Sequence, residues 1–209
     1  MEAVEKIKLF LRSTSGYVPI ALLIAYIGVI GWSAYAKTSA RVLPPKVVAS
    51  AAEAAEVAAG TPVRIIIPKI GVDTKIQAVG KGKSGNMAVP SGLRQYHEAG
   101  WYRLGPKPGE VGNAVIAGHY NTGAFGLPAV FWKLNELVPG DEIFVASEDG
   151  TLRFVVGAVE EYHPETTPIE RVFGAADTPR LNLITCSGEW DSGAGEYTHR
   201  RVVYAALSG

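Results

Sequence analysis

The only cysteine of this 209-residue chain, Cys186, is its strongest candidate for chemistry. It follows the apolar stretch 181–185, which is typical of a β-strand, and precedes the Ser/Gly/Asp-rich stretch 187–195, which is typical of a loop. A thiol at a strand end is held by a rigid scaffold and remains open to solvent, as catalytic residues often are. The N-terminal sequence points to export, where a lone cysteine has no internal disulfide partner. From its position alone, Cys186 is either a working thiol or an inert core residue.

One of the four histidines has a setting that matches that of the cysteine. His119 ends the short apolar run 113–117, and its neighbours Ala117 and Gly118 are small enough to let a substrate approach. A thiol forms a thiolate near neutral pH only beside an imidazole or another cation, so we expect His119 to lie near Cys186. The other histidines lie in polar loop sequence or before a basic pair: His97, His163 and His199.

A third candidate is one of two adjacent arginines, Arg200 and Arg201, which follow the cysteine by fourteen and fifteen residues. Neighbouring residues of a strand point to opposite faces, so only one of them can face the thiol. An arginine there would stabilise the oxyanion of a tetrahedral intermediate or hold the substrate backbone. We expect no metal and no cofactor, since the chain has no CxxC or HExxH pattern and only one thiol.

Short apolar runs separated by turn residues indicate a mainly β domain. The chain has 24 glycines and 13 prolines, which cluster between these runs. Residues 147–150 predict a hairpin turn, and residues 127–137 predict a short helix with an early proline. Seven or so short strands favour a closed or nearly closed β-barrel. The expected strands are 63–67, 72–79 (paired with the first), 113–117, 141–146, 151–159, 180–185 and 200–207.

The N-terminal quarter of the chain predicts a membrane anchor. Residues 17–36 carry no charge, and a helix of that length spans roughly 30 Å, the thickness of the hydrocarbon core. A cleaved signal peptide is the alternative, because Ala34-Tyr35-Ala36 fits a cleavage site. We therefore expect a cytoplasmic tail at 1–16, an anchor at 17–36, a stalk at 37–60 and a folded domain at 61–209. With 20 basic and 20 acidic residues and no basic stripe, nucleic-acid binding has no electrostatic support.

Together these residues resemble the sortases, cysteine transpeptidases of the bacterial cell surface. The resemblance covers about residues 63–205 and includes the Cys186, His119 and Arg200 set. It is carried by three stretches: Arg64–Gly71 (RIIIPKIG), Ala114–His119 (AVIAGH) and Leu183–Cys186 (LITC). Asn182 departs from the usual Thr-Leu-x-Thr-Cys pattern, in which a threonine stands at that position.

The resemblance implies a fold and a reaction. The fold would be an eight-stranded β-barrel. The reaction would cleave a C-terminal sorting signal of the Leu-Pro-x-Thr-Gly type between Thr and Gly and transfer the protein to an amine on a peptidoglycan precursor or a pilin lysine. Cys186 would be the nucleophile, His119 the acid and base, and Arg200 the oxyanion donor, with Arg201 as the alternative.

The same resemblance implies that the loop 161–178 helps to bind the signal, and Ala117 and Thr185 are candidate pocket residues. The partners would be exported proteins that carry such a signal, and the domain would face outside from a single-pass anchor. Two other classes stay open: an exported cysteine peptidase that uses water as acceptor, and a non-catalytic anchored β-domain.

Overall fold

The computed structural model describes residues 59–123 and 126–209. The expected membrane span, 17–36, and nearly all of the expected stalk, 37–60, lie outside these residues. Among the helices of the described part, none is long and apolar enough to cross a bilayer.

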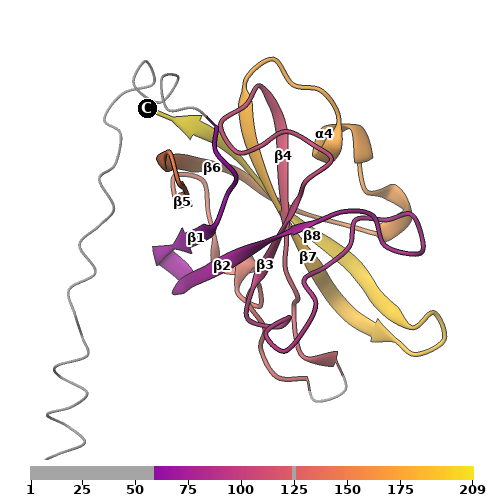
Figure 1. The fold of residues 1–209 in the computed structure, drawn as a ribbon. Helices are drawn as coiled ribbons and strands as arrows, with labels where there is room; N and C mark the ends of the chain where they lie inside the picture. Colours follow the sequence, from indigo (N-terminus) through magenta and orange to yellow (C-terminus); the bar gives the residue numbers. More distant parts are fainter. Residues whose placement is uncertain (1–58, 124–125) are drawn as a thin grey trace, which may run out of the picture. The chain divides into compact units, whose positions relative to one another are not determined.

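The described residues form a closed barrel of eight strands (Figure 1). Around the barrel the strands follow the order β1, β2, β3, β4, β7, β8, β6, β5. The pairs β2–β3 and β4–β7 are parallel, and the other neighbours are antiparallel. The eight-stranded barrel that the sequence implied is therefore confirmed. The strands are β1 (Arg64–Ile67), β2 (Val72–Val79), β3 (Ala99–Tyr102), β4 (Gly112–Ala117), β5 (Glu142–Ser147), β6 (Gly150–Tyr162), β7 (Pro179–Asp191) and β8 (Glu196–Ser208).

The short helices lie between the strands. They are η1 (Pro68–Ile70), η3 (Leu134–Glu136), η4 (Pro164–Thr166) and α4 (Ile169–Phe173). Figure 1 shows α4 on the outside of the barrel near β4, within the connection from β6 to β7.

Alternating side chains divide the barrel into an inner and an outer face. The interior is filled by a large apolar cluster that includes Phe131 and Phe154, both fully buried. A smaller cluster of Val115, Val172 and Val202 lies outside the barrel and packs α4 against β4 and β8. Two apolar clusters on opposite faces keep the middle of β4, β7 and β8 buried on both sides.

Two expected pairings are confirmed. β1 and β2 pair antiparallel from Arg64 opposite Lys75 to Ile67 opposite Val72. β5 and β6 form a hairpin in which Ser147 pairs with Gly150, so two residues make the turn.

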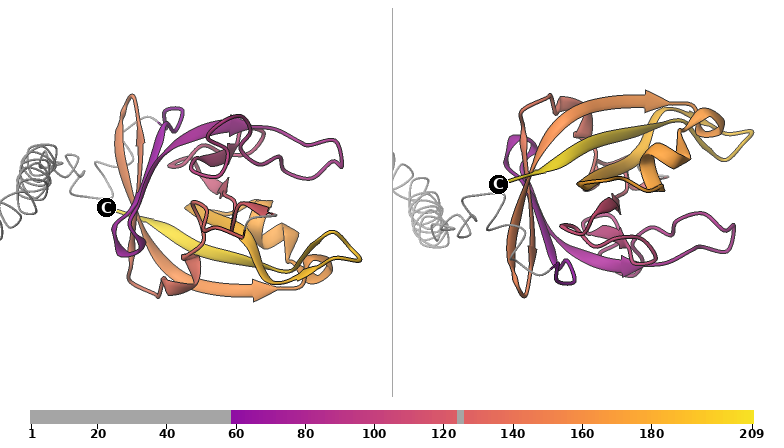
Figure 2. Two further views of the ribbon diagram at one scale, coloured as in Figure 1. Left: turned by 90° about the horizontal axis from the view of Figure 1, so that it is seen from below. Right: turned by 90° about the horizontal axis from the view of Figure 1, so that it is seen from above.

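The expected strand end at Cys186 is wrong. β7 continues through the thiol to Asp191, and a β-bulge accommodates Gly188, whose φ of +77° favours glycine. The expected loop 187–195 is therefore the end of a long hairpin that projects past the barrel (Figure 2). For the same reason Arg200 lies inside β8 and not at its start.

The expected helix at 127–137 is reduced to the single turn η3. Backbone bonds explain this, because Val130 donates to the Tyr96 carbonyl and Phe131 to the His119 carbonyl. These bonds tie the start of the segment to its neighbours, and the rest forms consecutive turns instead of an α-helix. The sequence analysis also missed β3, whose four residues, Ala99–Tyr102, are too few to show a period.

Candidate functional site

Two of the candidate catalytic residues lie on neighbouring strands, and the third, His119, follows the end of the next strand, β4. Cys186 on β7 is paired directly with Arg200 on β8. On the other side of β7, Ala117 of β4 pairs with Ile184, and the Gly118 amide donates to the Ile184 carbonyl at 3.1 Å. β4 ends at Ala117, and His119 follows two residues later, on the side of β7 away from β8. The barrel thus pairs the thiol with Arg200 and brings the chain that leads to His119 along the other edge of β7.

All three side chains belong to the outer face of the barrel. On β7, Leu181 and Leu183 fill the interior, so the even-numbered Cys186 points outward. On β8, Val203 is in the core and Val202 is in the outer cluster. Arg200 lies two residues from Val202, so its side chain also points outward. β4 follows the same rule, with Ile116 inside and Val115 outside, so that His119 also belongs to the outer face.

Cys186 is a free, half-buried thiol. Burial raises its pKa above the usual 9.0, the positive charge of Arg200 lowers it, and the negative charge of Glu196 raises it further. In the resting protein the thiol is therefore mostly protonated at neutral pH. A nucleophilic role requires proton transfer to a nearby base.

His119 is the candidate for that base. Burial lowers its pKa below 6.5, and a hydrogen bond to the backbone of Pro90 acts in the opposite direction. Its Nε2 atom is buried and has no hydrogen-bond partner among the described residues. The ring of Tyr96 packs against the imidazole with a centroid separation of 5.1 Å.

Arg200 is held by three acceptors. Its Nη1 atom donates to the carbonyls of Tyr197 at 2.8 Å and His199 at 3.0 Å, and its Nη2 atom donates to Glu196 at 2.5 Å. A guanidinium has five N–H donors, so two remain for a ligand. With its side chain only 21% exposed, Arg200 can present these donors to an oxyanion with little competition from water.

Arg201, the alternative, faces the other way. It pairs with Thr185 across the hairpin and forms an ion pair of 2.9 Å with Glu161 of β6. Arg201 lies two residues from Val203, so its side chain belongs to the inner face, opposite to that of the thiol. The geometry favours Arg200 over Arg201.

The two candidate pocket residues differ in their surroundings. Ala117 shares the outer face with His119 and is 6% exposed. Thr185 points to the opposite face, is 4% exposed, and donates its hydroxyl to the Gly118 carbonyl at 2.8 Å. This bond fastens the end of β4 to β7 just before His119. Through this bond Thr185 helps to position the histidine.

Asn182, which departs from the usual pattern, makes hydrogen bonds inside the protein. It is buried, and its Nδ2 atom donates to Asn113 at 3.1 Å and to the Val172 carbonyl at 2.8 Å. The amide side chain therefore links β7 to β4 and to α4. A threonine at this position has a single hydroxyl donor and could not make both bonds.

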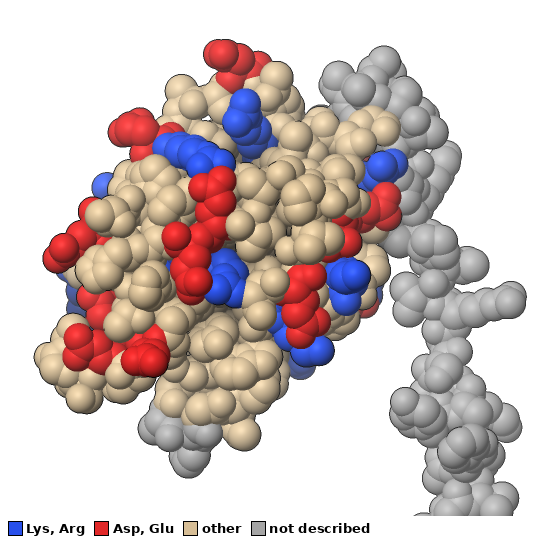
Figure 3. Space-filling model, turned by 180° about the vertical axis from the view of Figure 1, so that it is seen from behind, with Lys and Arg blue, Asp and Glu red and all other residues tan. Residues whose placement is uncertain are grey.

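The electrostatics of the described residues give no sign of a metal or of a polyanionic partner. No group of three or more His, Cys, Asp or Glu side chains is arranged to hold a metal ion within residues 59–123 and 126–209. On the face seen in Figure 3, basic and acidic side chains are interspersed.

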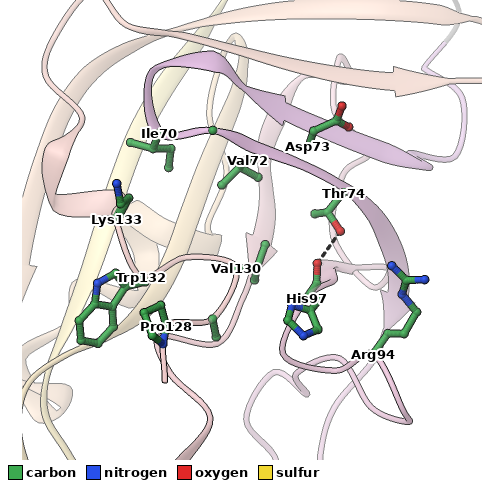
Figure 4. Close-up of a pocket in the computed structure, with 12 residues that line it drawn as sticks. Ile70, Val72, Asp73, Thr74, Arg94, His97, Pro128, Val130, Trp132 and Lys133 are labelled. Atoms are coloured by element: carbon green, nitrogen blue, oxygen red, sulfur yellow. Dashed lines mark hydrogen bonds between the residues drawn. The ribbon is translucent and has the colours of Figure 1, made fainter. Parts of the chain in front are cut away.

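A separate pocket of about 470 Å³ lies away from the three residues. It is formed by the start of β2, the end of the β2–β3 connection and residues 128–133. Figure 4 shows Trp132 and Lys133 on one side of it and Arg94 on the other, with the Thr74 hydroxyl bonded to the His97 carbonyl. Neither Cys186 nor Arg200 lines it.

The sequence analysis missed Pro90, Tyr96 and Glu196 as neighbours of the site. Pro90 and Tyr96 come from the β2–β3 connection, whose path over His119 leaves no periodic signal. Glu196 could have been found only by knowing that β8 begins there, since its four-residue spacing from Arg200 suggests a contact in a helix and not in a strand.

In the comparison with known proteins, the chain matches the model of one family. The family model described as "Sortase domain" matches residues 65–208. Similar solved structures include sortase A of Corynebacterium diphtheriae (a lid mutant; 20% identity, TM-score 0.54) and sortase C-1 of Actinomyces oris (24%, 0.52). A sortase D5 transpeptidase of Clostridium perfringens is 26% identical, with a TM-score of 0.52.

The alignments span most of each chain. They cover 71%, 70% and 71% of this chain, respectively, and 70%, 71% and 79% of those chains. Among curated proteins, none matches this chain.

Proposed function

The chain belongs to the sortase family of cysteine transpeptidases, and on that premise we propose that it cleaves a C-terminal sorting signal of exported proteins between Thr and Gly and joins the new carboxyl end to an amine. The observation that carries this proposal is the direct pairing of Cys186 with Arg200 across β7 and β8, with His119 two residues beyond the end of the neighbouring strand β4. A base, a nucleophile and an oxyanion donor are the groups that acyl transfer requires.

The proposed reaction has two halves that share one imidazole. In the first, His119 takes the proton of Cys186, the thiolate attacks the Thr carbonyl, and Arg200 donates to the oxyanion. His119 then gives its proton to the leaving Gly amine, and a thioester remains on Cys186. In the second half an amine attacks the thioester and His119 accepts the amine proton. Collapse of the oxyanion then expels the Cys186 thiolate, which takes that proton back from His119.

The outer face next to Cys186 offers a site for the signal. Ile184 and Ala117 continue this face from the catalytic residues toward α4, and the outer cluster gives it an apolar floor. The expected signal-binding loop, 161–178, contains α4 and is held to the barrel by Arg171, which forms an ion pair of 2.6 Å with Glu160 and lies 3.8 Å over the Tyr204 ring. These contacts support a preformed wall for an extended, apolar peptide.

The partners follow from the same premise. The substrates would be exported proteins that carry the signal, and the acceptor would be an amine of a peptidoglycan precursor or a pilin lysine. We propose that residues 17–36 anchor the protein with its domain on the extracytoplasmic face.

A labelled peptide with a Leu-Pro-x-Thr-Gly-like sequence tests the proposal. The protein would be incubated with the peptide in the presence and absence of an amine acceptor, and the products separated. We expect cleavage after Thr and an amine adduct that exceeds the hydrolysis product when amine is present. Hydrolysis that always dominates would indicate a peptidase that uses water.

A further inference from the structure

The ion pair between Glu196 and Arg200 joins the tip of the β7–β8 hairpin to the proposed catalytic centre. We infer that Glu196 is a positioning residue, which orients the guanidinium of Arg200 and offsets its charge beside the thiol. This inference rests on the proposed function, because it assigns a role to Arg200 in acyl transfer.

The bonds of Arg200 show what Glu196 contributes. Strand residues four apart lie about 13 Å apart, so the two side chains must lean along β8 to meet at 2.5 Å. Two backbone carbonyls hold Nη1, and Glu196 alone holds Nη2. Loss of the carboxylate would leave the guanidinium tethered at one nitrogen and free to rotate. The two donors left for an oxyanion would then lose their fixed direction.

The hairpin supports this anchor rigidly. The Tyr197 hydroxyl accepts a hydrogen bond from Asn121, and the Tyr197 ring packs edge-on against Tyr120 at 5.5 Å. The carbonyl of the same Tyr197 binds Arg200, so the aromatic contacts fix one acceptor while Glu196 provides the other.

Glu196 occupies a position where a second acid is already present. It lies directly opposite Asp191, and like charges facing each other across a hairpin are destabilising. Asp191 is needed at the turn, because its carboxylate accepts from the amides of Gly193 and Ala194. The positive charge of Arg200 compensates Glu196, which ties the hairpin tip to the site.

The charge of Glu196 also reaches the thiol. Within the described residues, the charged groups that act on the Cys186 thiol are Arg200 and Glu196 of β8, and His119 follows the end of β4, the other strand paired with β7. Arg200 lowers the pKa of Cys186 and Glu196 raises it. Removing the negative charge while keeping an acceptor should therefore make the thiol more acidic without releasing Arg200.

Three variants of the full-length protein separate these effects. Glu196→Gln keeps an acceptor oxygen and removes the charge, whereas Glu196→Ala removes both. Glu189→Gln removes an equal charge from the same hairpin, at an exposed residue whose carboxylate has no ion pair within the described residues. For each variant, the rate of Cys186 alkylation by iodoacetamide is measured across pH, and kcat and KM are measured with the sorting peptide.

We expect Glu196→Gln to shift the alkylation profile to lower pH, with alkylation about threefold faster on its acidic limb. Glu196→Ala should lose about tenfold in kcat, while Glu196→Gln stays within about threefold of the wild type. Glu189→Gln should change neither. A wild-type alkylation profile in Glu196→Gln, or a wild-type kcat in Glu196→Ala, would overturn the inference. Failure of the wild type to turn over any sorting peptide would instead count against the proposed function, and the alkylation profile would still report on Glu196.

Discussion

Cys186 and Arg200 are directly paired across β7 and β8, yet the Arg200 guanidinium is bound 2.5 Å from Glu196 at the start of β8. The proposed oxyanion donor is thus held toward the tip of the hairpin, while His119 follows the end of β4, the strand on the other side of β7. A carbonyl that enters between them would meet a nucleophile, a base and two free N–H donors. This arrangement makes the roles of the individual residues testable.

The two arginines should differ sharply on substitution. Arg200→Ala should lower kcat/KM by about a hundredfold or more, because it removes the oxyanion donor. Arg201→Ala should keep most of the activity, since its partner is Glu161 on the opposite side of the hairpin. Steady-state cleavage of the sorting peptide measures both, and an equal loss in the two variants would contradict the assignment.

The pH dependence of kcat/KM should be a broad bell. The reactive form has one proton on the pair, as thiolate and imidazolium. Its acid limb should follow the lowered pKa of His119 and lie below 6.5, because protonation of both groups removes the thiolate. Its alkaline limb should follow the raised pKa of Cys186 and lie above 9.0, because deprotonation of both removes the acid. A narrow optimum between these ordinary values would contradict the buried setting of the two residues.

Thr185 should affect both stability and turnover. Thr185→Val keeps the shape but leaves the buried Gly118 carbonyl without its 2.8 Å partner, which costs about 1–3 kcal/mol. Because Gly118 precedes His119, kcat should fall as well. Thr185→Ser retains the hydroxyl and serves as the control. Thermal unfolding and peptide cleavage measure the two effects, and a valine variant that matches the wild type in both would show that the bond is unimportant.

Several parts of the fold could be predicted because their signals are local. The β-branched run before Pro68 predicted β1, and the polar turn at 147–150 predicted the β5–β6 hairpin. The strand-like runs before His119 and Cys186 predicted that both residues lie on strands or at their ends. Two of those strands, β4 and β7, are neighbours in the barrel, which local sequence cannot show.

Other parts depend on contacts between distant segments. The glycines after Cys186 predicted a loop, but β8 pairs with β7 past the bulge and extends the hairpin. The apolar spacing at 127–137 predicted a helix, but backbone bonds to Tyr96 and His119 hold its start, and the rest forms turns. The ion pair between Glu196 and Arg200 could not be predicted for the same reason, because it depends on where β8 begins and on the direction of the Arg200 side chain.

The central claim is that Cys186 becomes acylated by the sorting peptide. It is tested most directly by mass spectrometry of the protein quenched in acid during turnover, with Cys186→Ala and His119→Ala as controls. We predict that the wild type gains the mass of the peptide fragment up to Thr, that the adduct maps to Cys186, and that both variants lack it. Peptide cleavage by Cys186→Ala at the wild-type rate, or an adduct at another residue, would contradict the account.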